Sequence, residues 1–345
     1  MKVAVICPYA LDAVGAVQAQ AIQLTQRLRA CGHGAWLVGP GNAGGGEARY
    51  VGSTVRIPVN RSVAPIALNP RSGRRALRAV AGADVVHIHE PFAPFVSLGV
   101  LMESEPPRVG TFHAAPGWGV NMIYKAAAPL LRRLANRLAV VTAVSPVAAS
   151  AVGSLTKKVR IIPNGFDFDF YQLALPRHPQ RVVFLGRDEP RKGLAVLLSA
   201  WERVQRQIPD AELMVLGALR AEPLRSVRYF GRVDDEAKRR ELARAAVLCA
   251  PNLGYESFGV VLLEGMAAGC AVVASRLPAF ESVVGDSGIL FSPGNVDGLA
   301  AALVELLRDP ERSQTLGQKA RENARQFSWE NVMPKYLDAY REAIG

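Results

Sequence analysis

The sequence predicts an α/β fold built from two Rossmann-like, doubly wound domains that face each other across a cleft. Short apolar runs alternate with helical stretches along most of the chain, which is typical of βα units on parallel sheets. The pattern restarts at residue 181, after a segment with two prolines at 174–179 that suits a linker. The length of 345 residues also fits about two domains. We therefore expect one domain at 1–172 and another at 173–328, with ligands at the carboxyl ends of the strands.

In the first domain the expected strands are short and rich in apolar and β-branched residues. Residues 39–46 are rich in glycine but do not spell Gly-x-Gly-x-x-Gly, so we interpret them as a flexible loop. Helices are expected at about 18–30, 71–80 and 124–138. The strands are expected at 3–8, 35–38, 85–89, 109–113, 139–144 and 159–163.

The second domain repeats this alternation of strand and helix. Its expected strands are 181–186, 213–217, 227–231, 247–251, 271–275 and 289–291.

Several classes of protein are excluded. No window approaches the ~18–20 uninterrupted apolar residues of a transmembrane helix. The apolar run at 2–6 is too short for a signal peptide, so none is expected. The four cysteines are widely spaced with no Cys-x-x-Cys, which argues against a disulfide framework or a zinc ribbon and suits a cytoplasmic protein.

Positive charge is concentrated in the first half. Residues 1–170 hold 18 Lys and Arg against 8 Asp and Glu, a net of +10, whereas residues 171–345 hold 23 against 22, a net of +1. This asymmetry predicts an anionic partner for the first domain, either nucleic acid or an anionic bilayer. No recognition module or basic motif interleaved with aromatic residues supports nucleic acid.

One helix concentrates this charge. Arg71, Arg74, Arg75 and Arg78 recur at i, i+3, i+4 and i+7, so a helix carries them on one face. Such a face suits an anionic lipid surface. A solvated helix face would have the same pattern.

The strongest chemical signal is the segment 254–269, in which two carboxylates eight residues apart flank a small, apolar helix start. Glu256 is expected in the loop and Glu264 on the helix. The backbone N–H groups of Phe258, Gly259 and Val260 would then lie at the helix N-terminus, where a diphosphate could bind with a carboxylate on each side. The spacing also fits an ordinary helix whose glutamates cap it or face solvent.

A second signal follows the first strand of the second domain. Arg187 and Lys192 are expected to emerge at the carboxyl edge of the sheet and to point into the cleft. A unit-charge pair at ~4 Å contributes ~4 kcal/mol at an effective dielectric constant of ~20, so two cations there could neutralise a departing diphosphate without a metal. A solvated basic turn is the alternative.

Together these segments resemble the retaining glycosyltransferases of family 4, which have the two-domain GT-B fold, and within them the phosphatidylinositol mannosyltransferases of actinobacteria. The resemblance covers nearly the whole chain and implies a last helix at about 329–345 that packs back on the first domain. It is carried in addition by residues 7–9, 12, 15, 17–18, 87–91, 111–113, 163–165 and 233–238.

The resemblance implies where a nucleotide-sugar donor binds, without a metal. The match at the base positions favours GDP-mannose over a UDP-sugar. The implied donor residues are Arg187, Lys192, Gly15 and Ala16 for the diphosphate, Glu256 for sugar hydroxyl groups, Glu264 for the ribose, Asp235 and Lys238 for guanine, and Ser257, Phe258, Gly259 and Val260 around them.

The resemblance also implies an acceptor site and a mechanism. His113 would lie near the reacting sugar and act in catalysis with Arg187, Lys192 and Glu256. No carboxylate of the first half matches a family nucleophile, which favours a front-side displacement in which the departing phosphate helps to deprotonate the acceptor. The acceptor implied is a lipid such as phosphatidylinositol at the cytoplasmic face of the membrane. The implied acceptor residues are Tyr9, Asp12 and Gln18.

Four positions depart from the family pattern. Ala16 replaces a second glycine, and its methyl group would hinder close approach of a phosphate. Phe92, Ala114 and Trp118 stand where the mannosyltransferases carry Asn, Thr and Lys near the inositol phosphate. An acceptor other than phosphatidylinositol, including a soluble one, is therefore an alternative.

Two short patterns resemble metal-binding motifs, but we do not expect a metal ion at either of them. Asp167 and Asp169 form an Asp-x-Asp, but they follow 163–165, where this fold crosses between domains. His87 and His89 share a strand face, but no third ligand has convincing spacing, so hydrogen-bonded histidines are expected.

Two rival functions remain: a nucleotide-sugar epimerase, and a basic membrane-binding module with a degenerate sugar site.

Overall fold

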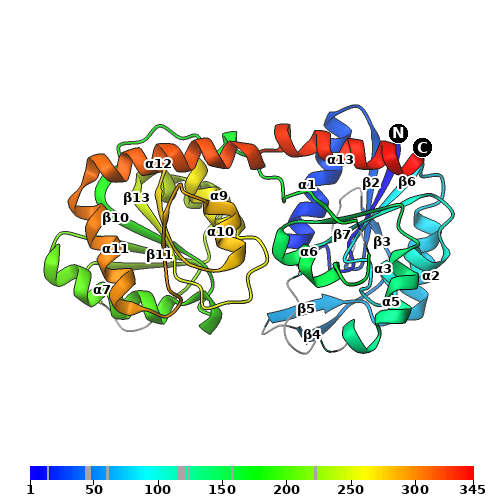
Figure 1. The fold of residues 1–345 in the computed structure, drawn as a ribbon, viewed down its shortest axis with the longest axis horizontal. Coiled ribbons are helices and arrows are strands. Elements are labelled where there is room, and N and C mark those ends of the chain that lie inside the picture. The colour runs from blue at the N-terminus through cyan, green and yellow to red at the C-terminus, as the bar shows by residue number, and fades with distance from the viewer. Residues whose placement is uncertain are drawn as a thin grey trace. The chain divides into compact units, whose positions relative to one another are not determined.

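The computed structural model describes residues 1–13, 15–42, 48–59, 62–114, 122, 124–156, 158–220 and 224–345. Trp118 and part of the glycine-rich segment 39–46 therefore lie outside the described residues. The chain divides into two compact units: Met1–Gly165 with Trp329–Gly345, and Phe166–Ser328. The division falls a few residues before the boundary expected after residue 172. Each unit contains a parallel sheet with helices packed around it (Figure 1), which confirms the predicted α/β class.

In the first unit the strand order reverses next to β1 (Lys2–Ile6), which lies between β2 (Gly34–Gly39) and β6 (Val85–His89). All three strands run parallel. At such a reversal the loops after the two central strands diverge and leave room for a ligand. The remaining strands of the order β3-β2-β1-β6-β7-β8-β9 are β3 (Arg49–Tyr50), β7 (Arg108–Phe112), β8 (Val140–Ala143) and β9 (Arg160–Ile161), and β4 (Val55–Val59) pairs separately with β5 (Ser62–Ile66).

Two helices from opposite ends of the sequence share one core of the first unit. α1 (Ala16–Ala30) and α13 (Trp329–Ile344) both pack their apolar side chains with Val3 and Val5 of β1. From α13 this core takes Trp329, Tyr336 and Tyr340, which are almost fully buried. The other helices are α2 (Pro70–Ala79), α3 (Val96–Glu103), α5 (Ala128–Ala135) and α6 (Pro146–Val152).

The sheet of the second unit reverses next to β10 (His178–Leu185), which lies between β11 (Glu212–Leu216) and β13 (Ala245–Ala250). These pairings are parallel as well. The sheet is completed by β12 (Val227–Gly231), β14 (Ala271–Ser275) and β15 (Ile289–Phe291), in the order β12-β11-β10-β13-β14-β15.

The helices of the second unit form a large apolar core with the sheet. α7 (Leu194–Gln207) and α11 (Val296–Arg308) pack together over Val182 and Phe184 of β10, and Trp201 of α7 is buried in the same core. The others are α8 (Asp235–Arg244), α9 (Val260–Ala267), α10 (Pro278–Val284) and α12 (Pro310–Ala324), with short 3-10 helices η1 (Asp169–Tyr171), η2 (Pro190–Lys192) and η3 (Arg325–Phe327). Among the helices of the described ranges, none has the length and apolar character needed to span a bilayer.

Candidate active site

The loops after β10 and β13 meet at the strand reversal of the second unit. The first loop carries η2 and ends at Gly193, and the second runs from Pro251 to the start of α9. Gly193 has a φ of +71°, and a Cβ there would lie 1.9 Å from the carbonyl oxygen of Pro251. Only glycine permits this approach, which brings the two loops into direct contact.

A cluster of cations surrounds Glu256 at this point. Its Oε1 accepts hydrogen bonds from Lys192 Nζ at 2.6 Å, Arg191 Nη1 at 2.8 Å and Asn252 Nδ2 at 2.8 Å. Among the described residues none bonds to Oε2 of this carboxylate. The Lys192 and Glu256 side chains are only 15% and 13% exposed, so their attraction is weakly screened. The structure therefore brings together two of the residues that the sequence predicts.

Arg187 lies at the outer end of the same network. Its Nη2 is 2.8 Å from Glu189 Oε1, and Glu189 also pairs with Arg191 Nε at 2.9 Å. The Arg187 side chain is 66% exposed, so it is free to exchange this partner for another anion. Sequence reasoning missed Arg191, Glu189 and Asn252. The alternating charges at 187–192 were the available signal for the first two, and nothing in the sequence marked Asn252.

Glu264 is held by a second cluster, on α9. Its Oε1 accepts from the Tyr171 hydroxyl at 2.8 Å and from Lys238 Nζ at 2.7 Å, and Lys238 also pairs with Asp235 Oδ1 at 2.9 Å. Burial acts to lower the pKa of Lys238, but the charges and hydrogen bonds of Glu264 and Asp235 together outweigh it, and the pKa is raised. Burial and the same carboxylate raise the pKa of Tyr171, which keeps this phenol a neutral donor. The structure thus groups Asp235, Lys238 and Glu264, and adds Tyr171.

The start of α9 lies between these two clusters in the sequence. Gly259, with a φ of +109°, precedes the first helical residue, Val260. The Phe258 side chain is buried against Phe327, with ring centroids 5.8 Å apart, so only its backbone could reach a ligand. The first N–H groups of a helix have no partner within the helix, which leaves this end suited to an anion.

In the first unit, the predicted acceptor residues lie in the loop after β1 and in α1. Asp12 is exposed, and its Oδ2 is 3.4 Å from the backbone nitrogen of Asn42. Gln18 is buried and donates to Ala10 O at 3.4 Å, folding back over Gly15. Gln18 therefore links α1 to the loop after β1 through Ala10. Ala16 is exposed at the first turn of α1.

Tyr9 forms an isolated bridge to Ile66 and lies near the buried Glu90. Burial, reinforced by the charge of Glu90, raises the pKa of Tyr9 well above its ordinary value. Glu90 has a φ of +46°, an uncommon conformation for a residue with a side chain. Its Oε1 accepts from the backbone N–H groups of His113 and Ala114, both at 2.8 Å. Glu90, which sequence reasoning did not select, thus fixes the backbone at His113.

His87 and His89, the histidines predicted to be hydrogen-bonded, are buried and bond to different partners. His87 Nδ1 lies 2.6 Å from the Tyr340 hydroxyl and its Nε2 lies 2.8 Å from Thr111 Oγ1, so both ring nitrogens are occupied. His89 Nδ1 lies 2.7 Å from His113 Nε2. Burial lowers the pKa of His87 and of His113 to about 3, and that of His89 well below its ordinary value. All three rings are therefore neutral near pH 7.

The four arginines of α2 are exposed on one side of that helix. Asn69 caps α2 by accepting from the Arg71 backbone N–H at 2.9 Å. The opposite side is buried and packs on α3, where a Cβ at Gly99 would lie 3.3 Å from Gly73 Cα. Within the described residues, none of the arginine side chains forms an ion pair. The exposed set is Arg71, Arg74, Arg75 and Arg78.

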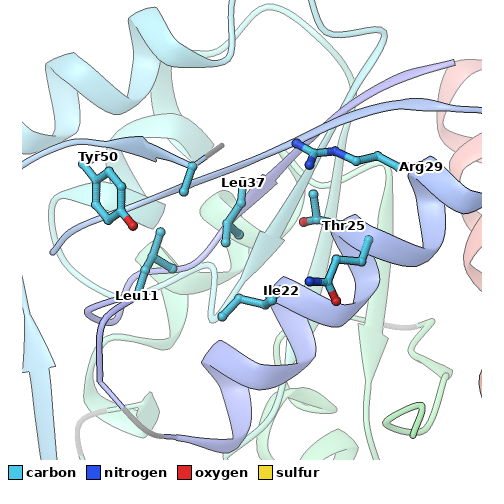
Figure 2. Close-up of a pocket in the computed structure, with 8 residues that line it drawn as sticks. Leu11, Ile22, Thr25, Arg29, Leu37 and Tyr50 are labelled. Atoms are coloured by element: carbon cyan, nitrogen blue, oxygen red, sulfur yellow. The ribbon is translucent and has the colours of Figure 1, made fainter. Parts of the chain in front are cut away.

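A pocket of about 220 Å³ lies elsewhere in the first unit, beside α1, β2 and β3. Leu11, Ile22, Leu37 and Tyr50 line it, with Thr25 and Arg29 toward one end (Figure 2). It contains none of the residues that the sequence selects, and Arg29 Nε already donates to a backbone carbonyl. The pocket is therefore separate from the candidate site.

Comparison with known proteins covers both units. Residues 17–170 match the family described as Glycosyltransferase Family 4, and residues 179–309 match Glycosyl transferases group 1. The phosphatidyl-myo-inositol mannosyltransferase of Mycolicibacterium smegmatis is 36% identical over 100% of this chain and 95% of its own length. The protein of the same name from Propionibacterium freudenreichii is 33% identical over 99% of this chain and 95% of its own length.

Solved structures show the same fold at lower identity. HepE from Anabaena in complex with UDP has a TM-score of 0.80 at 18% identity, covering 99% of this chain and 100% of its own. Sucrose-phosphate synthase from Thermosynechococcus elongatus has a TM-score of 0.78 at 20% identity, covering 99% of this chain and 98% of its own. These matches confirm the GT-B type of fold.

Proposed function

The chain belongs to glycosyltransferase family 4, and on that premise we propose that it transfers a mannosyl group from GDP-mannose to a lipid acceptor, with phosphatidylinositol as the leading candidate. The observation that carries this proposal is the similarity to mannosyltransferases over the full chain, combined with the charged cluster around Glu256. The donor half of the proposal rests on the second unit, and the acceptor half on the first.

The donor diphosphate is assigned to Lys192 and Arg187. Both cations are held by carboxylates, at 2.6 Å and 2.8 Å, and both can turn toward a phosphate with little rearrangement. Glu256 is assigned to sugar hydroxyl groups because its donors converge on Oε1, which leaves Oε2 to accept from a hydroxyl. Glu264 is assigned to the ribose on the same ground, since Tyr171 and Lys238 both bond to its Oε1.

Binding of the nucleotide base is assigned to Asp235 and Lys238, and these two residues favour guanine over uracil. The Asp235 side chain is 79% exposed, so its second oxygen can accept from the N1–H and exocyclic amine of guanine. Uracil presents a different edge. We expect GDP to bind more tightly than UDP, and Asp235→Asn to narrow that difference.

The proposed reaction is a front-side displacement at the sugar C1. The bond from C1 to the phosphate oxygen breaks, the bond from C1 to the acceptor oxygen forms on the same face, and the acceptor proton passes to the departing phosphate. Arg187 and Lys192 stabilise the negative charge that develops on the leaving group. His113 is assigned to the reacting sugar. Glu256 and Glu264 do not flank a scissile bond as the acid and nucleophile of a glycosidase do.

The acceptor is proposed to be a lipid because α2 presents on one exposed face four arginines that form no ion pair with any described residue. Each basic residue near an anionic bilayer contributes ~1 kcal/mol, so the face supports peripheral binding at the cytoplasmic side of the membrane. Phe92 replaces a polar residue of the mannosyltransferases and packs against Phe112 and Tyr124, with ring centroids 5.2 Å and 6.0 Å apart. That replacement supports an acceptor other than phosphatidylinositol as the second candidate.

Transfer of labelled mannose from GDP-mannose tests the proposal directly. Product is expected with phosphatidylinositol vesicles. Product with phosphatidylglycerol vesicles or with a soluble sugar acceptor alone would overturn the choice of acceptor. Tighter binding of UDP than of GDP in calorimetry would overturn the choice of donor. Release of an altered nucleotide sugar without any acceptor would favour the epimerase.

Vesicle co-sedimentation tests the membrane assignment. Replacing three arginines of α2 by Gln is expected to weaken binding to anionic vesicles by ~3 kcal/mol, on the order of 100-fold, without affecting GDP binding. Equal binding of the unmodified protein to neutral and anionic vesicles would contradict the assignment. A matched control removes the same charge from exposed positions of the second unit. The test set is Arg74, Arg75 and Arg78, and the control set is Arg206, Arg308 and Arg321.

A further inference from the structure

His89 lies behind His113 and is fully buried. His89 ends β6, His113 directly follows β7, and these two strands are parallel neighbours. The Nδ1 of His89 is 2.7 Å from Nε2 of His113. The other ring nitrogen of His89, Nε2, is buried and has no hydrogen-bond partner. This unmatched nitrogen determines which ring donates the proton.

Two arrangements of the shared proton are possible between neutral rings. If His113 donated from Nε2, His89 would carry its own proton on its buried, unpartnered Nε2. An orphaned N–H inside a protein is costly and rare, whereas an unused lone pair is tolerated more readily. In the second arrangement His89 Nδ1–H donates to His113 Nε2, and the buried Nε2 of His89 is left with only an unmatched lone pair. Since a neutral imidazole carries one proton, that of His113 must then be on Nδ1.

We propose that His89 is a positioning residue that fixes His113 in its Nδ1–H tautomer, so that His113 offers substrate a hydrogen-bond donor and not a base. His113 Nδ1 has no hydrogen bond to any described residue, and about 5% of the surface of this residue is exposed. The role at the sugar rests on the proposed function. The tautomer itself does not.

The His87 ring is fixed by a directed chain of hydrogen bonds, and it restrains His89 by stacking on it. Thr142 Oγ1 donates to Gly110 O at 3.1 Å, so Thr111 Oγ1 must donate to Thr142 at 2.6 Å. Thr111 then accepts from His87 Nε2, which leaves His87 Nδ1 to accept from the Tyr340 hydroxyl. His87 stacks on His89 with ring centroids 4.6 Å apart, and this contact restrains the His89 ring plane.

Nitrogen-15 NMR of the histidine side chains tests the tautomer in the full chain without substrate. The sequence has 5 histidines, so each ring can be assigned by substitution. We expect His113 to show a protonated Nδ1 and an unprotonated Nε2, and His89 to show the same pattern. A protonated Nε2 on His113 would overturn the proposal, whatever the chain transfers.

Two substitutions test the consequence for activity. Asn at position 89 can keep a donor near the site of Nδ1–H, whereas Leu removes it. His89→Leu is expected to lower kcat about tenfold, the equivalent of one lost hydrogen bond, with unchanged affinity for GDP. His89→Asn is expected to retain most of the activity, and His33→Asn serves as a control outside the cluster. A folded His89→Leu variant with unaltered kcat would overturn the role of His89, and should it fail to fold, the NMR measurement on the unmodified protein still decides the tautomer.

Discussion

Lys192 Nζ lies 2.6 Å from Glu256 Oε1, and the two residues come from loops that follow different strands. The contact is possible because β10 and β13 are adjacent where the strand order reverses. If the donor diphosphate binds Lys192 as proposed, Glu256 loses this partner and keeps Arg191 and Asn252. This carboxylate competes with any anion that binds at the same cations.

The first prediction separates the roles of these two residues. Glu256→Gln is expected to abolish transfer yet leave the GDP affinity unchanged or increase it, because the variant frees two cations. Lys192→Gln is expected to weaken GDP at least ~10-fold through loss of one charge-assisted contact. Isothermal calorimetry with GDP measures both, with the exposed Arg276→Gln as control. Equal insensitivity of GDP binding to the two changes would refute the assignment.

The second prediction concerns Tyr171, whose hydroxyl donates to Glu264 at 2.8 Å. Tyr171→Phe removes a hydrogen bond to a charged acceptor, so the unfolding free energy should fall by ~1.5–3 kcal/mol. Affinity for GDP should fall with it, because Glu264 loses one of the two donors that orient it. Urea unfolding and calorimetry measure the two effects, and Tyr50→Phe in the first unit is the control. A loss of stability no larger than in that control would show that the Tyr171 bond contributes little.

The third prediction tests the contact between the two loops of the second unit. Gly193→Ala combines a positive φ with a Cβ only 1.9 Å from Pro251 O, so the loops must separate. Gly294→Ala in the same unit is a matched control, since its φ is +78° and the atom nearest to the added Cβ lies 3.8 Å away. The control should cost the ~1 kcal/mol of a left-handed residue, and Gly193→Ala clearly more. Similar melting temperatures for the two variants would contradict the close approach.

The fourth prediction follows from the buried histidines of the first unit. The pKa of His87 and of His113 is about 3, and that of His89 is also well below the ~6.5 of an unfolded chain. Below pH ~6.5 the unfolded state therefore binds up to three more protons, and stability is lost as the pH falls. A pKa that is lower in the folded state than in the unfolded state always gives this direction of pH dependence.

The size of that loss can be measured by urea unfolding. Three such groups lower the unfolding free energy by up to ~4 kcal/mol between about pH 7.5 and about pH 5.5. His33→Gln is the control, because this residue is only partly buried and should carry little of the effect. If the slope of the unfolding free energy with pH corresponded to uptake of fewer than one proton on unfolding, these rings would be ionised in the folded protein.

The sequence predicts most of the sheets because βα units repeat a strong apolar pattern. It does not predict β4 and β5, where Pro58 and Pro65 interrupt the strand pattern, nor α3, which Phe95 precedes with a φ of +62°. Those elements depend on contacts that a local pattern does not contain.

The same distinction applies to the candidate site. The positions of Glu256 and Glu264, in the loop and on the helix, follow from helix and strand boundaries alone. Their partners Asn252 and Tyr171 do not, because the fold, and not the spacing, decides which donors reach a carboxylate. The proposed roles in binding sugar, ribose and base stay predictions.

The first unit consists of two segments of the chain, Met1–Gly165 and Trp329–Gly345, and this division affects the order in which the two units can fold. Gly165 packs against the Trp329 ring, and a Cβ at that glycine would come within 2.5 Å of it. On the ribosome, 1–165 emerge first but must wait for the last helix before their core can close, while Phe166–Ser328 is already complete. We therefore expect the unit that is translated first to finish folding last, with the apolar side chains that α13 covers exposed until then.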